Sequence, residues 1–237
     1  HNIYCTNIEI PQMQSITTNT TWRNVSIVNK IIIEKDAVLT IEGAVTCTNP
    51  DNLIIEDGGQ LIHNNNGVKA TLKKDIKGYG TTNSGWYTIS SPLVANTNLS
   101  DIEGLMSNDH DIYRYDEPTC LWQNAKDDSN YFNDIEIGRG YLYANKNDVT
   151  LSFSGELNAN NVACFLTKTE DKALSGFHLI GNPFAHDIYK GKGAAIDDNN
   201  LVKGYYVLHN SGTWGVKLSD DNPIAPCQSI LVKTIAE

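Results

Sequence analysis

Three short acidic stretches contain the residue types best suited to metal chemistry. They are Asp127-Asp128-Ser129-Asn130, Asp197-Asp198-Asn199-Asn200 and Asp220-Asp221-Asn222. Carboxylate and amide oxygens in a turn are the ligands that Ca²⁺ takes, so a weak calcium site is one interpretation. Its candidate ligands are Asp127, Asp128, Asp197, Asp198, Asp220 and Asp221. The stretches lack EF-hand spacing, and Asp and Asn also favour turns by bonding their own backbone, so solvated turns are the leading interpretation.

Aromatic residues offer a second chemistry, the stacking of sugar rings on an apolar ring face. The candidates for such a platform are Tyr115, Trp122, Tyr143, Tyr206 and Trp214. Trp122 and Trp214 occupy equivalent positions of an internal duplication, which favours core packing for these two.

Catalytic motifs are scarce. The sequence contains no GxSxG nucleophile elbow and no glycine-rich phosphate loop, so we expect no cofactor and nominate no catalytic residue. His178 lies in an apolar run and is expected to be a strand residue with a hydrogen-bonded ring. His186-Asp187 follows Pro183-Phe184 in a predicted loop and is the better catalytic candidate.

The five cysteines are Cys5, Cys47, Cys120, Cys164 and Cys227. They lie far apart, which excludes CxxC zinc and redox motifs. Buried thiols and one or two disulfides both remain open, and no pairing follows from the sequence.

The N-terminal third contains a repeat of 22 residues, because residues 31–39 align with residues 53–61 without a gap. A fixed period in the low twenties is typical of a β-solenoid, whose coils bury their inner face only by stacking. Strands at residues 25–28 and 68–72 allow three or four coils. Glu34 and Glu56 occupy equivalent positions and are interpreted as solvent-facing corner residues. So short a stack needs a cap, most simply the domain that follows it.

The rest of the chain contains a duplication. Gly85–Pro92 returns 91 residues later as Gly176–Pro183, and two further segments match in the same order. Each copy reads as a strand, a hairpin and a closing strand. The two copies differ in the residues that end the first strand, Ser90-Ser91 against Gly181-Asn182, and we expect any binding specificity near these loops.

The predicted fold is therefore all-β, with a short N-terminal β-solenoid of about 22-residue coils and then a duplicated β-sandwich or barrel-like domain. The solenoid occupies residues 1–77 and the second domain residues 78–237, with its units at about 85–155 and 176–235. Further strands are expected at residues 150–155 and 162–166, and one helical turn at residues 101–106.

Charge and hydropathy limit the partners. The net charge of −10 and the pI near 5.0 disfavour nucleic acid, whose phosphates need clustered Lys and Arg. No run of 18 apolar residues occurs, so membrane insertion is not expected.

Several motifs together resemble a known class of proteins. They are Gly85-Trp86-Tyr87-Thr88-Ile89-Ser90-Ser91-Pro92, Tyr113-Arg114-Tyr115-Asp116-Glu117, Trp122-Gln123-Asn124, Gly138-Arg139-Gly140-Tyr141-Leu142-Tyr143-Ala144-Asn145 and Gly176-Phe177-His178-Leu179-Ile180-Gly181-Asn182-Pro183-Phe184. This series resembles the β-rich repeat modules of large secreted or surface-attached Bacteroidota proteins exported by the type IX system.

The resemblance implies export to an extracellular or cell-surface location, a multi-domain parent protein and an accessory or adhesive role. We expect a structural or adhesive module whose partners are a glycan or protein surface and the other domains of the parent protein. It supplies no catalytic residue. A carbohydrate-binding module that uses exposed aromatics is the alternative function, and a glycan-degrading hydrolase or lyase is the third.

Overall fold

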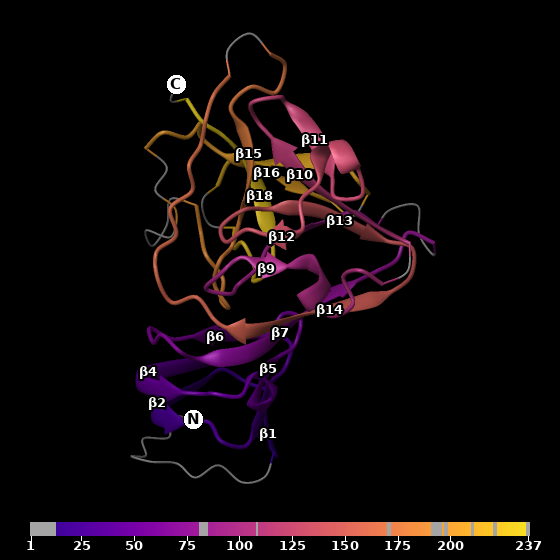
Figure 1. Cartoon of the computed structure of the whole chain (residues 1–237). Coiled ribbons are helices and arrows are strands. Elements are labelled where there is room, and N and C mark those ends of the chain that lie inside the picture. The colour runs from indigo at the N-terminus through magenta and orange to yellow at the C-terminus, as the bar shows by residue number, and fades with distance from the viewer. Residues whose placement is uncertain are drawn as a thin grey trace.

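The computed structural model describes residues 13–80, 85–107, 109–169, 172–190, 196, 199–209, 211–219 and 222–235. This part of the chain is all-β, as predicted (Figure 1). Its helical segments are three short 3-10 turns, η1 (Pro50–Asn52), η2 (Leu99–Asp101) and η3 (Asp128–Asn130). The helical turn expected at residues 101–106 is therefore wrong beyond Asp101, because η2 ends there and residues 102–106 form a bend, a bridge and a turn.

The N-terminal part is a β-solenoid of about three turns. Its strands are, in chain order, β1 (Met13–Ile16), β2 (Thr20–Ser26), β3 (Lys30–Ile33), β4 (Val38–Thr46), β5 (Leu53–Ile55), β6 (Gln60–Ile62) and β7 (Lys69–Ile76). They form two parallel stacks, β1-β3-β5-β7 and β2-β4-β6. Ile31 pairs with Leu53 and Leu39 pairs with Leu61, so the 22-residue period is confirmed as the register between coils.

Alternation along the strands divides the side chains between the core and the solvent. Ile31, Ile33 and Leu53 are fully buried inside the solenoid, whereas Ile32 is only partly buried. The corner after these strands needs a left-handed residue in each coil, which Asp36 and Gly58 supply at equivalent repeat positions with φ of 65° and 88°. The repeat therefore specifies both the strands and the corner between them.

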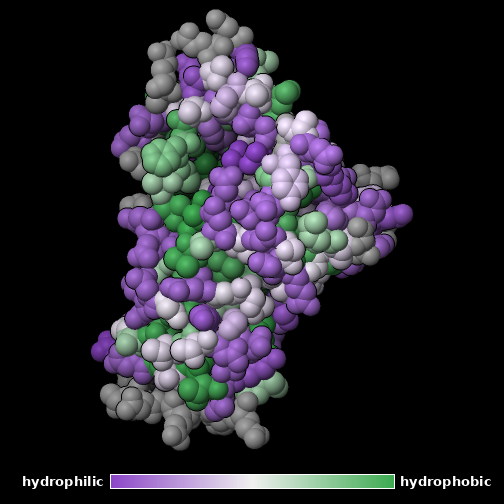
Figure 2. Space-filling model, in the orientation of Figure 1, coloured by the Kyte–Doolittle hydropathy of each residue, from purple (hydrophilic) through white to green (hydrophobic). Residues whose placement is uncertain are grey.

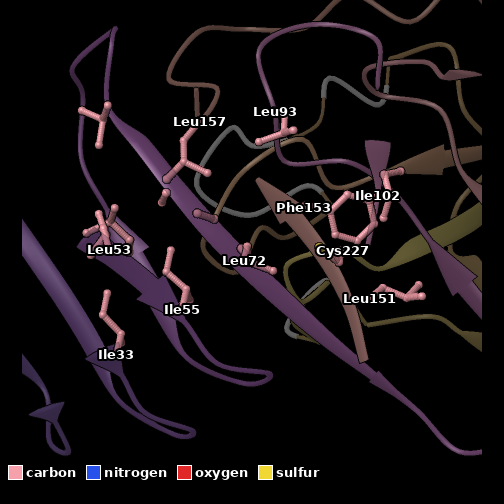
Figure 3. Close-up of a cluster of buried hydrophobic side chains, with 14 of the residues drawn as sticks. Ile33, Leu53, Ile55, Leu72, Leu93, Ile102, Leu151, Phe153, Leu157 and Cys227 are labelled. Atoms are coloured by element: carbon pink, nitrogen blue, oxygen red, sulfur yellow. The ribbon is translucent and has the colours of Figure 1, made fainter. Parts of the chain in front are cut away.

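The last coil is capped by the segments that follow it, as predicted. β14 (Val149–Glu156) pairs antiparallel with β7 through eight residue pairs. The backbone oxygen of Ala185 accepts a hydrogen bond of 2.8 Å from the Leu61 nitrogen, which covers β6. Figure 3 shows Leu151 and Phe153 of β14 in the same cluster of buried side chains as Leu72 and Ile55.

The duplication is visible in two antiparallel sheets of the same strand order, β11-β10-β13-β8 and β17-β16-β18-β15. The first contains β8 (Tyr87–Ile89), β10 (His110–Asp116), β11 (Leu121–Asn124) and β13 (Tyr141–Asn145). The second contains β15 (Phe177–Gly181), β16 (Tyr205–Leu208), β17 (Trp214–Lys217) and β18 (Ser229–Lys233). Both predicted hairpins are present, as β10 with β11 and β16 with β17. A small ladder of β9 (Thr97–Asn98) and β12 (Asp134–Ile135) accompanies the first sheet.

The two sheets meet through equivalent residues. The Ser90 nitrogen donates to the Cys227 oxygen at 3.2 Å, and its counterpart, the Gly181 nitrogen, donates to the Gly138 oxygen at 2.9 Å. Cys227 and Gly138 are themselves counterparts, and both have a positive φ. Such reciprocal contacts are the mark of a two-fold relation, here between two halves of one chain.

This contact corrects two expectations. Ser90, Ser91 and Asn182 are fully buried where the sheets meet, so the expectation that specificity lies at these loops is wrong. Residues 162–166 form no strand, so that expectation is also wrong. Ile180 bridges to Arg139, and the His178 ring bonds Thr167.

The predicted domain boundary near Lys77 follows the end of β7 at Ile76. β14, however, returns to the solenoid sheet from the later part of the chain. The division at residue 77 stays a prediction.

Candidate functional site

A polar hollow of about 290 Å³ lies on the outer face of the sheet β1-β3-β5-β7-β14. We call it the sheet groove. Its floor is a row of neighbouring residues on adjacent strands, because Ile32 pairs with Ile54, Ile54 with Thr71, and Thr71 with Ser154. Alternate residues of these strands, such as Phe153, fill the core, so the row faces outward. The floor is thus apolar at one end and carries hydroxyl groups at the other.

An ion pair lies beside this row. The Lys73 Nζ is 2.8 Å from the Glu56 Oε1, and each side chain is about one third exposed. Glu56 lies at the corner after β5, as expected, but it is only partly exposed because it is paired with Lys73, and it is also part of the groove.

The remaining charged residues of the groove lie in or just after short 3-10 turns, except for one at the start of a strand. Asp51 lies in η1, whose N-cap Asn49 accepts the Asp51 nitrogen at 3.1 Å. Asp101 is the last residue of η2. Glu103 is bridged to β14 by a backbone hydrogen bond of 3.0 Å, which the Ser152 nitrogen donates to the backbone oxygen of Glu103. Lys30, at the start of β3, completes the lining. The groove therefore forms only where the solenoid meets the first antiparallel unit.

Ser152 is a largely buried polar residue of the groove. The residue as a whole is 8% exposed, and within the part of the chain that the structure describes its hydroxyl has no hydrogen-bond partner. By contrast, the hydroxyls of Thr71 and Ser154 bond each other at 3.0 Å. Among the described residues no buried side-chain oxygen or nitrogen lacks a partner, so the unpaired Ser152 hydroxyl is open to the hollow and can bond a ligand there. The sequence signal for this site was the outward alternation of Ser152 and Ser154 around Phe153, which has meaning only once the neighbouring strands are known.

The predicted aromatic platform is not assembled. Tyr143 is fully buried and donates to the Leu105 oxygen at 2.8 Å, and Tyr115 is 5% exposed and donates to the Leu174 oxygen at 2.9 Å. The prediction of an exposed sugar platform is wrong for these two rings, because the phenol hydroxyl finds a partner inside the fold.

The other three rings are partly buried and lie on two different sheets. Trp122 of β11 packs on Tyr115 with ring centroids 5.2 Å apart, and Tyr206 of β16 packs on Phe177 at 5.9 Å. Trp214 lies on β17 of the second sheet. The structure does not bring the five rings together.

The acidic stretches behave as turns where they are described. The Asp127 Oδ1 accepts the Ser129 nitrogen at 3.0 Å and the Ser129 hydroxyl at 2.7 Å, which caps η3, and Asp128 lies within that turn. Among the described residues, no group of three or more His, Cys, Asp or Glu side chains is placed to hold a metal ion. Asp197, Asp198, Asp220 and Asp221 lie outside the described residues.

The four described cysteines, Cys47, Cys120, Cys164 and Cys227, are free thiols, and Cys5 lies outside the described residues. Burial raises the pKa of the Cys47 thiol, partly offset by its bond to the Asn49 oxygen. None of these four cysteines therefore forms a disulfide.

The two histidine predictions end differently. His178 is a strand residue whose Nε2 lies 2.7 Å from the Thr167 oxygen, as predicted. The pair His186-Asp187 lies against the last solenoid coil, where the Asp187 nitrogen donates to the Gln60 Oε1 at 2.8 Å. Burial raises the pKa of Asp187. This pair belongs to the junction with the solenoid and lies outside the sheet groove.

Glu117 is a buried carboxylate in the hairpin turn between β10 and β11, and its hydrogen bonds hold the fold together. It accepts hydrogen bonds from the Thr169 nitrogen (2.6 Å), the Gly176 nitrogen (2.8 Å) and the hydroxyls of Thr167 (2.8 Å) and Thr169 (3.1 Å). Burial alone would raise the pKa of Glu117, but these four bonds to the charged form outweigh it and lower the pKa to about 2. Glu117 therefore fastens the first unit to the segment that leads into the second.

Replacing Glu117 with glutamine is expected to lower the free energy of unfolding by about 2 kcal/mol at neutral pH, because bonds to a charged acceptor are lost. The pKa of Glu117 is lowered on folding, so its contribution is complete above the ordinary value of 4.5 and is lost as the pH falls towards 2. Urea denaturation at several pH values should show the wild type and Glu117→Gln converging in acid. The exposed Glu42, replaced by glutamine, is the matched control. A gap between wild type and Glu117→Gln that is independent of pH would contradict this account.

A second hollow of about 500 Å³ lies between residues 161–166 and the second antiparallel sheet, and its lining includes Val162, Ile180 and Phe184. Figure 2 shows that apolar residues gather towards the left of one face of the molecule, whereas hydrophilic residues cover most of the rest.

Comparison with known proteins found no family model, no curated protein and no solved structure that matches this chain. Within the described ranges, none of the helical turns has the length and apolar character that a bilayer crossing requires.

Proposed function

We propose that this chain is a non-catalytic extracellular module of a bacterial surface or secreted protein, with a structural framework and an adhesive site in the sheet groove, where it binds carbohydrate. The observation that carries the proposal is Ser152, a largely buried residue whose hydroxyl has no partner among the described residues, in a hollow lined by acidic, basic and hydroxyl-bearing residues. Sugars present hydroxyl groups that both donate and accept, so they match such a lining, and the aliphatic side chains of Ile32 and Ile54 suit the apolar face of a ring.

The scaffold supports binding because the groove is built on paired strands. Its floor belongs to four neighbouring strands, and the β7–β14 ladder joins the solenoid to the rest of the chain. A site on rigid elements loses little conformational entropy when a ligand binds, which favours affinity. This is the property that an adhesive module needs.

The glycan-degrading alternative requires two carboxylates about 5–10 Å apart on either side of a scissile bond. The groove contains Asp51, Glu56, Asp101 and Glu103, so the alternative must be tested at the same site. Against it, Glu56 is held by Lys73. The carboxylate with the largest pKa shift, Glu117, is bonded within the fold and is not part of the groove.

The proposal is tested on a glycan array with two matched tryptophan variants. Ser154 and Ser26 are both exposed strand residues whose hydroxyls bond a threonine on the neighbouring strand at 3.0 Å, but only Ser154 lines the groove. We expect Ser154→Trp to weaken glycan binding by about tenfold or more by filling the hollow, and Ser26→Trp to leave it unchanged. Wild-type protein that binds no glycan, or that releases shortened products from one, would overturn the proposal.

A further inference from the structure

We infer that the sheet groove selects sugars that carry a free amine, that is, segments of a hexosamine polymer, over neutral or acidic sugars. This inference rests on the proposed function and names the ligand class of the same site.

The charged side chains that line the sheet groove are not all paired with one another. The Lys73 ammonium is paired with the Glu56 carboxylate at 2.8 Å, so these two charges neutralise each other. The carboxylates of Asp51, Asp101 and Glu103 and the ammonium of Lys30 form no ion pair with a described residue. The groove therefore presents an excess of two negative charges to a ligand.

An excess of negative charge in the groove favours a ligand that carries a positive charge. An ammonium group among carboxylates gains charge-assisted hydrogen bonds, which are about twice as strong as neutral ones. A uronic acid would add a carboxylate to a site already in excess of negative charge, which is unfavourable. A neutral N-acetylated sugar has the same ring but lacks the charge.

The Ser152 hydroxyl favours a sugar over a lysine side chain as the ligand. Ser152 is 8% exposed with a free hydroxyl, and its backbone nitrogen is fixed by the Glu103 oxygen at 3.0 Å. A hexosamine carries both a ring hydroxyl for Ser152 and an ammonium for the carboxylates, whereas an alkyl ammonium offers only the second group. The hollow of about 290 Å³ is at the small end of ligand sites, which suits a short saccharide.

The inference is tested by isothermal titration calorimetry with three short oligosaccharides of matched length. They are β-1,4-linked glucosamine, its fully N-acetylated counterpart and oligogalacturonate. We expect the glucosamine oligomer to bind about tenfold or more tightly than the N-acetylated one, with a preference that falls as salt is added, and oligogalacturonate to bind most weakly.

Groove variants show whether the preference arises at this site. In Asp101→Asn/Glu103→Gln the preference for the amine should fall towards unity. In Glu42→Gln/Asp109→Asn, which removes the same net charge outside the groove, it should persist. Ser152→Ala should weaken both glucosamine forms by a similar factor, because the ring hydroxyl is common to both.

Equal or tighter binding of the N-acetylated or acidic oligomer would overturn the inference while leaving a glycan-binding groove intact. A preference that survives Asp101→Asn/Glu103→Gln, or an oligolysine peptide that binds more tightly than the glucosamine oligomer, would overturn it as well. If no saccharide binds, in this experiment and on the array, the proposed function itself fails.

Discussion

Phe153→Ala is expected to lower the free energy of unfolding by about 3–5 kcal/mol, the range for removing a large buried aromatic side chain. Phe153 is fully buried on β14, opposite Leu72 of β7. Figure 3 places it between the solenoid strands and Ile102 of the first antiparallel unit. The same hydrophobic cluster runs from Ile16 in the first coil to Cys227 near the end of the chain. Destabilisation at this point should therefore affect the solenoid and the first unit together.

The measurement is urea denaturation followed by tryptophan fluorescence, combined with hydrogen exchange of the peptides that contain β3 and β5. Phe165→Ala makes the same chemical change at a side chain that is 94% exposed, and it should change stability by no more than about 0.5 kcal/mol. In Phe153→Ala the solenoid peptides should lose protection at the same urea concentration as the fluorescence changes. Solenoid peptides that stay protected after the rest has unfolded would show that the coils are stable without β14.

The solenoid can be predicted from the sequence because the 22-residue period of the repeat equals the spacing between paired residues of neighbouring coils. Ile31 and Leu53 are 22 residues apart and are paired neighbours, so a comparison of the chain with itself finds the contact. The duplication is visible for a similar reason. The two copies share strand order, and their left-handed positions at Gly138 and Cys227 are equivalent even though the residue types differ.

The groove could not be predicted in this way. Beside the solenoid strands, its members come from η1, from η2 and the segment after it, and from β14, and no repeat or local pattern brings these together. The pairing of β14 with β7 joins Val149 to Ile76, and nothing in either strand specifies that partner. Residue type alone also does not predict which aromatic rings are exposed. A tyrosine such as Tyr143 is as suitable for a core as for a sugar site, and Tyr143 is buried in a strand that lies between β8 and β10. Function therefore depends here on contacts between distant segments.

Gly181→Ser is expected to lower the free energy of unfolding by about 3 kcal/mol, at the upper end of the cost of overpacking. A Cβ at Gly181 would lie 2.3 Å from the Ser90 Cβ and 2.8 Å from the Arg139 oxygen, so the two sheets would have to move apart. Ser90 is the counterpart of Gly181 in the other copy. At this contact there is room for one side chain from the two equivalent positions.

The two-fold relation between the copies makes a stronger prediction for the exchanged pair, Ser90→Gly/Gly181→Ser. In the wild type the single hydroxyl hydrogen of Ser90 is shared between the Asn182 oxygen at 3.1 Å and the Gln228 oxygen at 3.0 Å. The counterparts of these acceptors are the backbone oxygens of Ser91 and Arg139, so a serine at position 181 should find equivalent partners once Ser90 is a glycine. We expect the double variant to recover about 1–2 kcal/mol relative to the sum of the two single variants. Urea denaturation of the full double-mutant cycle measures this coupling, and strict additivity would mean that the two positions do not compete for the same space.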